Sequence, residues 1–248
     1  MTDTTTSHGE RVAIITGASR GLGLALARDL AGKGWRLVLD ARGGEALTRV
    51  GAELGRRTTV VTITGDVVDE SHRHRLVAEA ARLGRLELLV NNASVLGPSP
   101  QPVLADYPLD ELRHVYEVNV VAPLRLVQLA LPLLEAAGGG VVNVTSDAAR
   151  EPYAGWGGYG SSKAALEQLS NVLAAEHPDL HVLWVDPGDM RTDLHQAAFP
   201  GEDISDRPPP EASVPGLLAL LGRDTPSGRY RVDEVSEEAV APNELVVT

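Results

Sequence analysis

Short apolar runs alternate along most of the chain with longer stretches in which apolar residues recur at helical spacing. Several short runs are apolar throughout, which is typical of strands covered on both faces. The predicted strands are 12–16, 37–39, 59–64, 86–90, 141–145 and 182–185, and the predicted helices are 21–33, 44–55, 69–83, 109–136 and 158–176. This alternation predicts an α/β fold in which right-handed βαβ units build a parallel sheet.

One break in composition interrupts the C-terminal third. Segment 199–210 reads FPGEDISDRPPP, and consecutive prolines continue neither a helix nor a central strand. We predict a long surface loop here, within a substrate lid at about 193–212, although a passive connection is the alternative. A short helix near 213–222 and a last strand at 228–232 should follow. The organisation is then a flexible segment 1–10, a single domain 11–235 and an acidic tail 236–248.

Charge and composition narrow the class of partner. The net charge of -12 argues against nucleic acid, because neutralising phosphates requires clustered Lys and Arg. The chain has no Cys, its first ten residues lack an apolar stretch, and it has no continuous apolar run of about 18 residues. We therefore expect a soluble cytoplasmic protein with a small-molecule partner, no membrane contact and no metal site.

A glycine-rich turn follows the first predicted strand. The segment Thr16–Gly23 reads TGASRGLG and leads directly into a helix. Glycine allows the backbone to turn tightly and to approach a pyrophosphate, while the helix N-terminus offers free N–H groups. A glycine-rich turn alone is weak, but here a strand precedes it and a helix follows, as the motif requires.

Residues at the end of the second strand should select between the two nicotinamide cofactors, and those present support both alternatives. Asp40 lies 17 residues after Gly23, close to the spacing of an acidic residue that binds a ribose hydroxyl. Arg42 and Arg20 together would instead suit a 2′-phosphate. Strand alternation sends Asp40 and Ala41 to opposite sides, so only one of them faces the ribose.

A tyrosine and a lysine form the candidate catalytic pair. Tyr159 and Lys163 are four residues apart at the start of a predicted helix, so their side chains share one face. An ammonium near a phenol favours the phenolate, which would lower the tyrosine pKa and suit it to move a proton. Such a pair is common by chance, so the motif needs support from elsewhere in the chain.

That support comes from the order of several motifs over roughly residues 10–195, which resembles a short-chain dehydrogenase/reductase of the single-domain branch. Ser146 lies 13 residues before Tyr159, which is the spacing of the family. The other matches are the turn Thr16–Gly23, Asp66 in GDV, 91–93 (NNA), Asn119, and 187–192 (PGDMRT). The resemblance implies a Rossmann-type doubly wound sheet of about seven strands with helices on both faces.

The resemblance also implies a role for each residue of a catalytic tetrad. Tyr159 is the general acid in reduction and the base in oxidation, and Lys163 binds the nicotinamide ribose and tunes Tyr159. Ser146 binds the substrate oxygen, and Asn119 keeps a relay water behind Lys163. The implied cofactor-binding residues are Gly17, Ser19, Arg20, Gly21, Leu22, Gly23, Arg42, Asp66, Val67, Asn92, Ala93, Ser94, Tyr159, Lys163, Pro187, Gly188, Met190 and Thr192.

The same resemblance decides the cofactor. Ala41 occupies the position of the aspartate that selects NAD, whereas Arg42 and Arg20 match the basic residues of members that prefer NADP. We therefore expect NADPH in preference to NADH. Two departures stand out: Ser94 replaces the glycine usual after the NNA motif, and the C-terminal end lacks the usual glycine-rich close.

The substrate is weakly encoded. Leu96, Ala148, Tyr153 and Trp156 are the candidate substrate contacts, with Trp156 placed to stack on a flat molecule. Arg150 could pair with an anionic substrate or lie in solvent, and His195 has no evident partner.

We expect reduction of a carbonyl compound or oxidation of an alcohol, in a homodimer or homotetramer built through helices 109–136 and 158–176. The alternatives are a catalytically silent NADP-binding regulatory protein and, less directly supported, a reductase of imines or enones. Loss of catalysis usually breaks the tetrad, and all four residues are present here, which favours the enzyme.

Overall fold

The computed structural model describes residues 10–222 and 225–235, so the predicted N-terminal segment, apart from Glu10, and the tail 236–248 lie outside the described residues. Seven parallel strands form one sheet in the order β3-β2-β1-β4-β5-β6-β7. They are β1 (Arg11–Ile15), β2 (Arg36–Ala41), β3 (Val60–Thr64), β4 (Arg85–Asn91), β5 (Gly140–Val144), β6 (His181–Asp186) and β7 (Gly228–Arg231). The predicted parallel sheet is confirmed, and its strand order reverses between β1 and β4, where doubly wound sheets bind their ligands.

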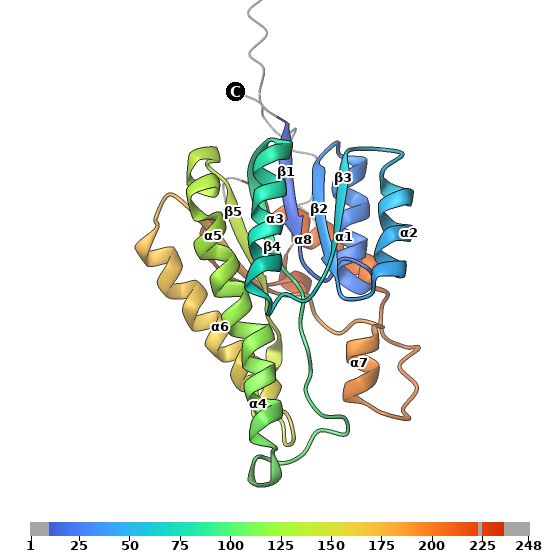
Figure 1. Cartoon of the computed structure of the whole chain (residues 1–248). Helices are drawn as coiled ribbons and strands as arrows, with labels where there is room; N and C mark the ends of the chain where they lie inside the picture. Colours follow the sequence, from blue (N-terminus) through green and yellow to red (C-terminus); the bar gives the residue numbers. More distant parts are fainter. Residues whose placement is uncertain (1–9, 223–224, 236–248) are drawn as a thin grey trace, which may run out of the picture.

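Helices cover both faces of the sheet (Figure 1). They are α1 (Gly21–Gly32), α2 (Gly44–Leu54), α3 (Glu70–Leu83), α4 (Leu109–Tyr116), α5 (Ala122–Ala137), α6 (Gly157–Glu176), α7 (Asp193–Ala198) and α8 (Val214–Leu220). One apolar core joins α1, α2 and α8 to the sheet, and a second joins α3 and α5, with α6 at its margin. The predicted helices are therefore present, in the doubly wound arrangement.

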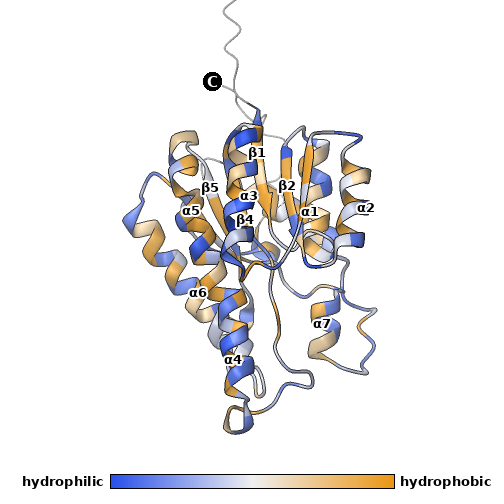
Figure 2. Ribbon diagram, in the orientation of Figure 1, coloured by the Kyte–Doolittle hydropathy of each residue, from blue (hydrophilic) through white to orange (hydrophobic). Residues whose placement is uncertain are grey.

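Strand β1 shows why the short runs are apolar throughout. Val12 and Ile14 belong to the core on the α3 and α5 side, whereas Ala13 and Ile15 belong to the core on the α1 side. All four side chains are fully buried, because successive residues of a strand point to opposite faces. Figure 2 shows the same hydrophobic character along β1, β2 and β3.

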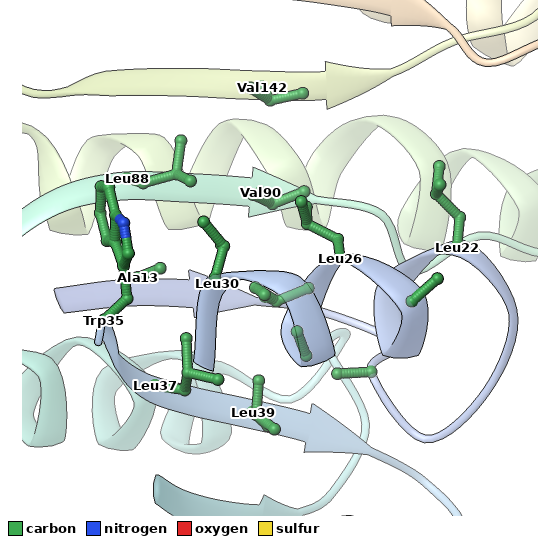
Figure 3. Packing of buried hydrophobic residues seen from close by; sticks show 14 of the residues in the cluster. Ala13, Leu22, Leu26, Leu30, Trp35, Leu37, Leu39, Leu88, Val90 and Val142 are labelled. Carbon is green, nitrogen blue, oxygen red and sulfur yellow. The ribbon is translucent and has the colours of Figure 1, made fainter. Parts of the chain in front are cut away.

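Helix α1 lies on the sheet through one stripe of leucines. Leu22, Leu26 and Leu30 are spaced four residues apart, so they share a face, and Figure 3 shows Leu26 and Leu30 directed toward Val90 and Leu88 of β4. Burying a leucine side chain contributes about 1.5–3 kcal/mol. This packing fixes the N-terminus of α1 at the carboxyl ends of β1 and β4.

The helix predicted at 109–136 is divided by a π-helical turn. Residues Glu117–Val121 form this turn (η2) between α4 and α5, and Asn119 lies within it. The run Leu109–Ala137 is long and apolar enough to cross a membrane by length and composition alone, and 44% of its apolar 18-residue stretch is buried in the fold. Because it packs on α3 and β4, we interpret it as a core helix of the domain.

The predicted lid contains a helix that the sequence pattern missed. Helix α7 begins after Thr192, whose side-chain oxygen accepts a hydrogen bond from the His195 backbone N–H at 3.2 Å. It has no buried residue, so no apolar stripe marked it in the sequence. The proline-rich segment after it is irregular up to a short 3-10 turn at Pro210–Ser213, as predicted. In Figure 1, α7 lies beyond the sheet, apart from the main helical layers.

Candidate active site

A cavity of about 1200 Å³ lies at the carboxyl ends of the strands. Most residues predicted for the site line it: Gly17, Ser19, Arg20, Gly21, Leu22, Arg42, Asp66, Val67, Asn92, Ala93, Ser94, Leu96, Ser146, Trp156, Tyr159, Lys163, Pro187, Gly188, Met190 and Thr192. Four others, Gly23, Asn119, Ala148 and Tyr153, do not line it. The chain therefore brings together segments that are up to about 175 residues apart in sequence.

The glycine-rich turn approaches the loop after β4 very closely. Gly17 has a φ of +67°, and a Cβ atom there would lie 3.0 Å from the Ala93 Cα. A Cβ atom on Gly23 would lie 2.5 Å from the Asn92 Nδ2, which is closer than real Cβ contacts. Gly23 thus serves the packing of the turn, which explains why it does not reach the cavity.

Two of the predicted motifs are bound to each other. The Asn92 side-chain amide donates to the carbonyl oxygens of Thr16, at 2.7 Å, and Gly17, at 3.3 Å. The Thr16 hydroxyl oxygen in return accepts from the backbone N–H groups of Asn92 and Ala93, both at 3.0 Å. Through its side chain, Asn92 fixes the turn that forms one wall of the cavity.

The Asp40 carboxylate is hydrogen-bonded within the protein. Its Oδ1 accepts from the Gly17 N–H at 2.8 Å, and its Oδ2 lies 2.9 Å from the His72 Nε2. Burial raises the pKa of Asp40, and the bonds to His72 and Gly17 act against that rise. Both carboxylate oxygens are engaged, so Asp40 holds the turn from below and offers no free oxygen to a ribose. No sequence pattern predicted the Asp40–His72 pair, because the two residues lie 32 positions apart.

The mouth of this part of the cavity carries two exposed arginines. Helix α1 begins at Gly21 with no acidic residue in its first turn, so its N–H groups face the cavity with a positive dipole end. Arg20 forms an ion pair with Asp193 of α7 at 2.5 Å, although both side chains are about 70% exposed. Arg42 forms no ion pair within the described part of the chain.

Tyr159 and Lys163 lie on the first turns of α6, as predicted. Both are almost fully buried, and the Lys163 Nζ lies 5.5 Å from the centre of the Tyr159 ring. The Lys163 ammonium donates to the Val144 carbonyl oxygen at 2.8 Å, so the end of β5 anchors it. Burial lowers the pKa of Lys163 to about 8.

The pKa of Tyr159 is shifted in the direction opposite to the expected one. Burial raises it well above the usual value, and the carboxylates of Asp186 and Asp147 raise it further. Hydrogen bonds with the hydroxyls of Ser94 and Ser146 lower it in part. Removing the phenolate from water outweighs the nearby ammonium, so at neutral pH Tyr159 carries its proton.

Ser146 follows β5 and faces the same space as Tyr159. Its hydroxyl donates to the Asp147 Oδ1 at 2.9 Å, and the Tyr153 hydroxyl donates to the Asp147 Oδ2 at 2.9 Å. Tyr153 is 46% exposed and lies outside the cavity, so its contribution is to hold Asp147.

Asn119 is buried behind the cavity wall. Its amide nitrogen donates to the Val95 carbonyl oxygen at 2.9 Å and to the Ser162 Oγ at 3.0 Å. Its Oδ1 accepts from the Val95 N–H at 2.9 Å and from the Ser94 hydroxyl at 3.1 Å. All four hydrogen-bonding positions of the amide are filled, so Asn119 joins the π-helical turn to the loop after β4 and to α6.

The other end of the cavity is aromatic. Trp156 makes edge contacts with Tyr159, at 6.0 Å between ring centres, and a tilted contact with Phe199, at 5.9 Å. His195 lines the cavity and packs on Phe199, which lies outside the lining, at 4.9 Å between ring centres. Leu96 and Ala148 pack behind Tyr159 in the same cluster. The arrangement suits a flat, largely apolar molecule.

A buried charged network beneath Ser146 was missed by sequence reasoning. Glu167 of α6 accepts from the Thr145 hydroxyl and from Arg229 of β7, both at 2.8 Å. Arg229 also contacts the Asp186 carboxylate at 3.4 Å. Arg150, a candidate partner for an anionic substrate, instead donates to Glu167 at 3.1 Å and lies outside the cavity. These residues carry no local motif, because partners far apart in sequence are recognised only in the fold.

Comparisons with known proteins agree with this geometry. The model of the short chain dehydrogenase family matches residues 11–203. Sepiapterin reductase of Mus musculus is 36% identical over 204 residues, which cover 77% of this chain and 78% of the relative. A putative short chain dehydrogenase from Pseudomonas syringae superposes with a TM-score of 0.83 at 31% identity, over 90% of this chain and 94% of the other. An alcohol dehydrogenase from the archaeon Thermococcus sibiricus, complexed with 5-hydroxy-NADP, gives 0.80 at 28% identity, over 90% and 95%.

Proposed function

The chain belongs to the short-chain dehydrogenase family, and on that premise we propose that it is an NADPH-dependent reductase of carbonyl compounds. It is an oxidoreductase acting on CH–OH or C=O groups. The observation that carries the proposal is the placement of Tyr159, Ser146 and Lys163 on one wall of a cavity whose other end is the glycine-rich turn.

The cavity has the chemistry that a nicotinamide dinucleotide phosphate needs. The close approach of Gly17 to Ala93 leaves backbone N–H groups at the start of α1 open to a pyrophosphate. Arg20 and Arg42 lie at the mouth, where they suit a 2′-phosphate, while the carboxylate of Asp40 is already engaged. The similar alcohol dehydrogenase that binds 5-hydroxy-NADP supports the same choice. When bound, the cofactor supplies the hydride.

The side chains of this wall then perform the proton transfer. Tyr159 is protonated at neutral pH because burial raises its pKa, so it donates its proton to the substrate oxygen. Ser146 binds the same oxygen, where negative charge develops. Lys163, anchored at the Val144 carbonyl, holds the nicotinamide ribose beside Tyr159. Asn119, whose side-chain amide is fully bonded to Ser94, Val95 and Ser162, fixes the loop after β4.

Trp156, which lines the cavity and packs against Phe199, favours flat ketones or aldehydes as substrates. We also propose a homodimer or homotetramer that pairs the surfaces of α4, α5 and α6. Val121 and Val172, which are 43% and 41% exposed, lie on this part of the chain and are apolar side chains that such an interface would cover.

A turnover assay tests the proposal. The purified protein is mixed with NADPH or NADH and a panel of aromatic and aliphatic aldehydes and ketones, and the loss of reduced cofactor is followed. We expect turnover of at least one aromatic member, with NADPH preferred. Tight NADPH binding without turnover of any compound would contradict the proposal and favour a silent NADP-binding regulatory protein.

A further inference from the structure

Ser94 stands where the resemblance leads to glycine, and its side chain lies beside the catalytic groups. Ser94 lines the cavity with Tyr159 and Ser146. Its Oγ lies 3.1 Å from the Asn119 Oδ1. It also lies near enough to the Tyr159 hydroxyl, on the same cavity, to lower the pKa of that phenol. A glycine at this position would leave both neighbours without this contact.

The direction of the bond to Asn119 follows from the partners of the amide. The Val95 N–H and carbonyl oxygen hold opposite sides of the Asn119 amide, so its oxygen and nitrogen are distinguished by their contacts. An amide oxygen only accepts, and therefore the hydrogen in the 3.1 Å contact belongs to Ser94. The lone pairs of the Ser94 oxygen are then left for the Tyr159 O–H.

The second serine at Tyr159 is engaged elsewhere. Ser146 donates its hydrogen to Asp147, and its expected role is to bind the substrate oxygen. Ser94 has no such competing acceptor besides Asn119 within the described residues. It is thus the hydroxyl best placed to serve the phenol oxygen once that oxygen becomes charged.

We propose that Ser94 is a positioning residue for proton transfer by Tyr159. While Tyr159 is protonated, Ser94 accepts its O–H and donates to Asn119. When the Tyr159 proton passes to the substrate oxygen, Ser94 turns its own hydrogen from Asn119 to the phenolate. Ser94 gains and loses no proton in this step. The inference rests on the proposed function, because it assigns Ser94 to the same reaction.

The burial of the phenolate determines in which direction the loss of Ser94 changes the pKa of Tyr159. Without the Ser94 hydroxyl, the largely buried phenolate loses one hydrogen bond, so the pKa of Tyr159 rises. Losing a hydrogen bond to a charged group corresponds to a shift of about one pKa unit. Oxidation of an alcohol needs the phenolate as base, so its pH profile is the sensitive readout.

The first experiment compares Ser94→Ala and Ser94→Gly with the wild type in alcohol oxidation with NADP⁺, recording kcat/KM against pH. We expect the rising limb of both variants to move to higher pH by about one unit. Ser161→Ala is the matched control, because Ser161 is exposed on the same helix turn as Tyr159 and should leave the profile unchanged. A purely structural role would lower kcat/KM at every pH without moving the limb. Profiles that coincide with the wild type overturn the inference.

The second experiment is independent of turnover. The chain has five tyrosines, so labelling their ζ-carbons gives a simple NMR spectrum in which Tyr159 is the signal absent from Tyr159→Phe. In the ligand-free protein we expect this signal to begin its alkaline shift at higher pH in Ser94→Ala than in the wild type. Identical titrations overturn the inference even if the enzyme is active. A wild type that turns over nothing, with separated titrations, overturns the proposed function alone.

Discussion

The two halves of the cavity are built by different means. The cofactor half, at the ends of β1, β2 and β4, is shaped by backbone contacts such as the approach of Gly17 to Ala93. The substrate half, at the ends of β5 and β6 with α7, is shaped by side chains such as Trp156 and His195. Helix α1 buries seven residues, whereas α7 buries none.

This difference makes the cofactor half rigid and leaves the substrate half able to change. Replacing Gly17 or Gly23 drives a Cβ atom against backbone or into a tightly bonded amide, so the shape of the cofactor half tolerates little change. A side chain of α7 can change with small loss of packing, because the helix contributes little to either core. A fold of this kind keeps one cofactor geometry while its substrate wall remains free to vary.

Removing the proton donor should affect the substrate half strongly and the cofactor half little. Tyr159→Phe should lower kcat/KM for carbonyl reduction by about 1000-fold, because the general acid is lost. NADPH binding, measured by fluorescence, should stay within about twofold, since backbone groups supply most cofactor contacts. Tyr230→Phe is the control, because Tyr230 of β7 lies outside the cavity and its hydroxyl donates to the carbonyl oxygen of Pro226, which precedes that strand. Activity of Tyr159→Phe within tenfold of the wild type would remove Tyr159 from the mechanism.

Lys163 lies where the two halves meet, and its buried ammonium should lower the free energy of unfolding. Its folded pKa of about 8 lies below the ordinary value of 10.5, so the unfolded chain binds more protons between these pH values. The ammonium therefore destabilises the fold fully below pH 8, by up to about 3 kcal/mol, and the loss disappears as pH rises toward 10.5.

Lys163→Met should thus raise the free energy of unfolding at pH 7 by about 2 kcal/mol, once the lost bond to Val144 is subtracted. Urea unfolding of the ligand-free proteins at pH 7 and pH 10 measures this gap, which should narrow at the higher pH. The chain has one other lysine, Lys33, which is exposed, so Lys33→Met is the matched control. An equal gap at both pH values would show that the ammonium is not the cause.

Reversing a charge at the mouth of the cavity should weaken the use of NADPH and leave the substrate half unchanged. Arg42→Asp should lower kcat/KM with NADPH by roughly 10- to 100-fold, the worth of a charged hydrogen bond to phosphate, and change the value with NADH little. Arg49→Asp on α2 is the control, because Arg49 is exposed and pairs only with Glu45. A wild type that uses NADH as well as NADPH, or a harmless Arg42→Asp, would refute the assignment.

Features that depend on neighbouring residues could be predicted from the sequence, whereas contacts between distant residues could not. The strands and the long helices follow from periodicity, and the glycine-rich turn and the Tyr159–Lys163 pair are local patterns. The Glu167–Arg229 contact joins residues 62 positions apart, and Asp40–His72 joins residues 32 positions apart, so neither leaves a local signal. Tyr159 shows the limit most clearly. Spacing to Lys163 predicted a lowered pKa, but burial, which depends on the whole fold, raises it.

An exposed ion pair at the mouth of the cavity joins the two halves, and its removal should give the smallest effect. Asp193 of α7 pairs with Arg20 at 2.5 Å, so a 2′-phosphate has to compete with it for the arginine. Exposed pairs contribute up to about 1 kcal/mol, so Asp193→Asn should lower KM for NADPH by at most about fivefold at low salt. The gain should vanish in 1 M salt, where the Debye length is about 3 Å. Asp206→Asn, which alters an exposed carboxylate paired with Arg207, is the control. An unchanged KM at low salt would show that α7 does not restrain Arg20, and that the halves act independently.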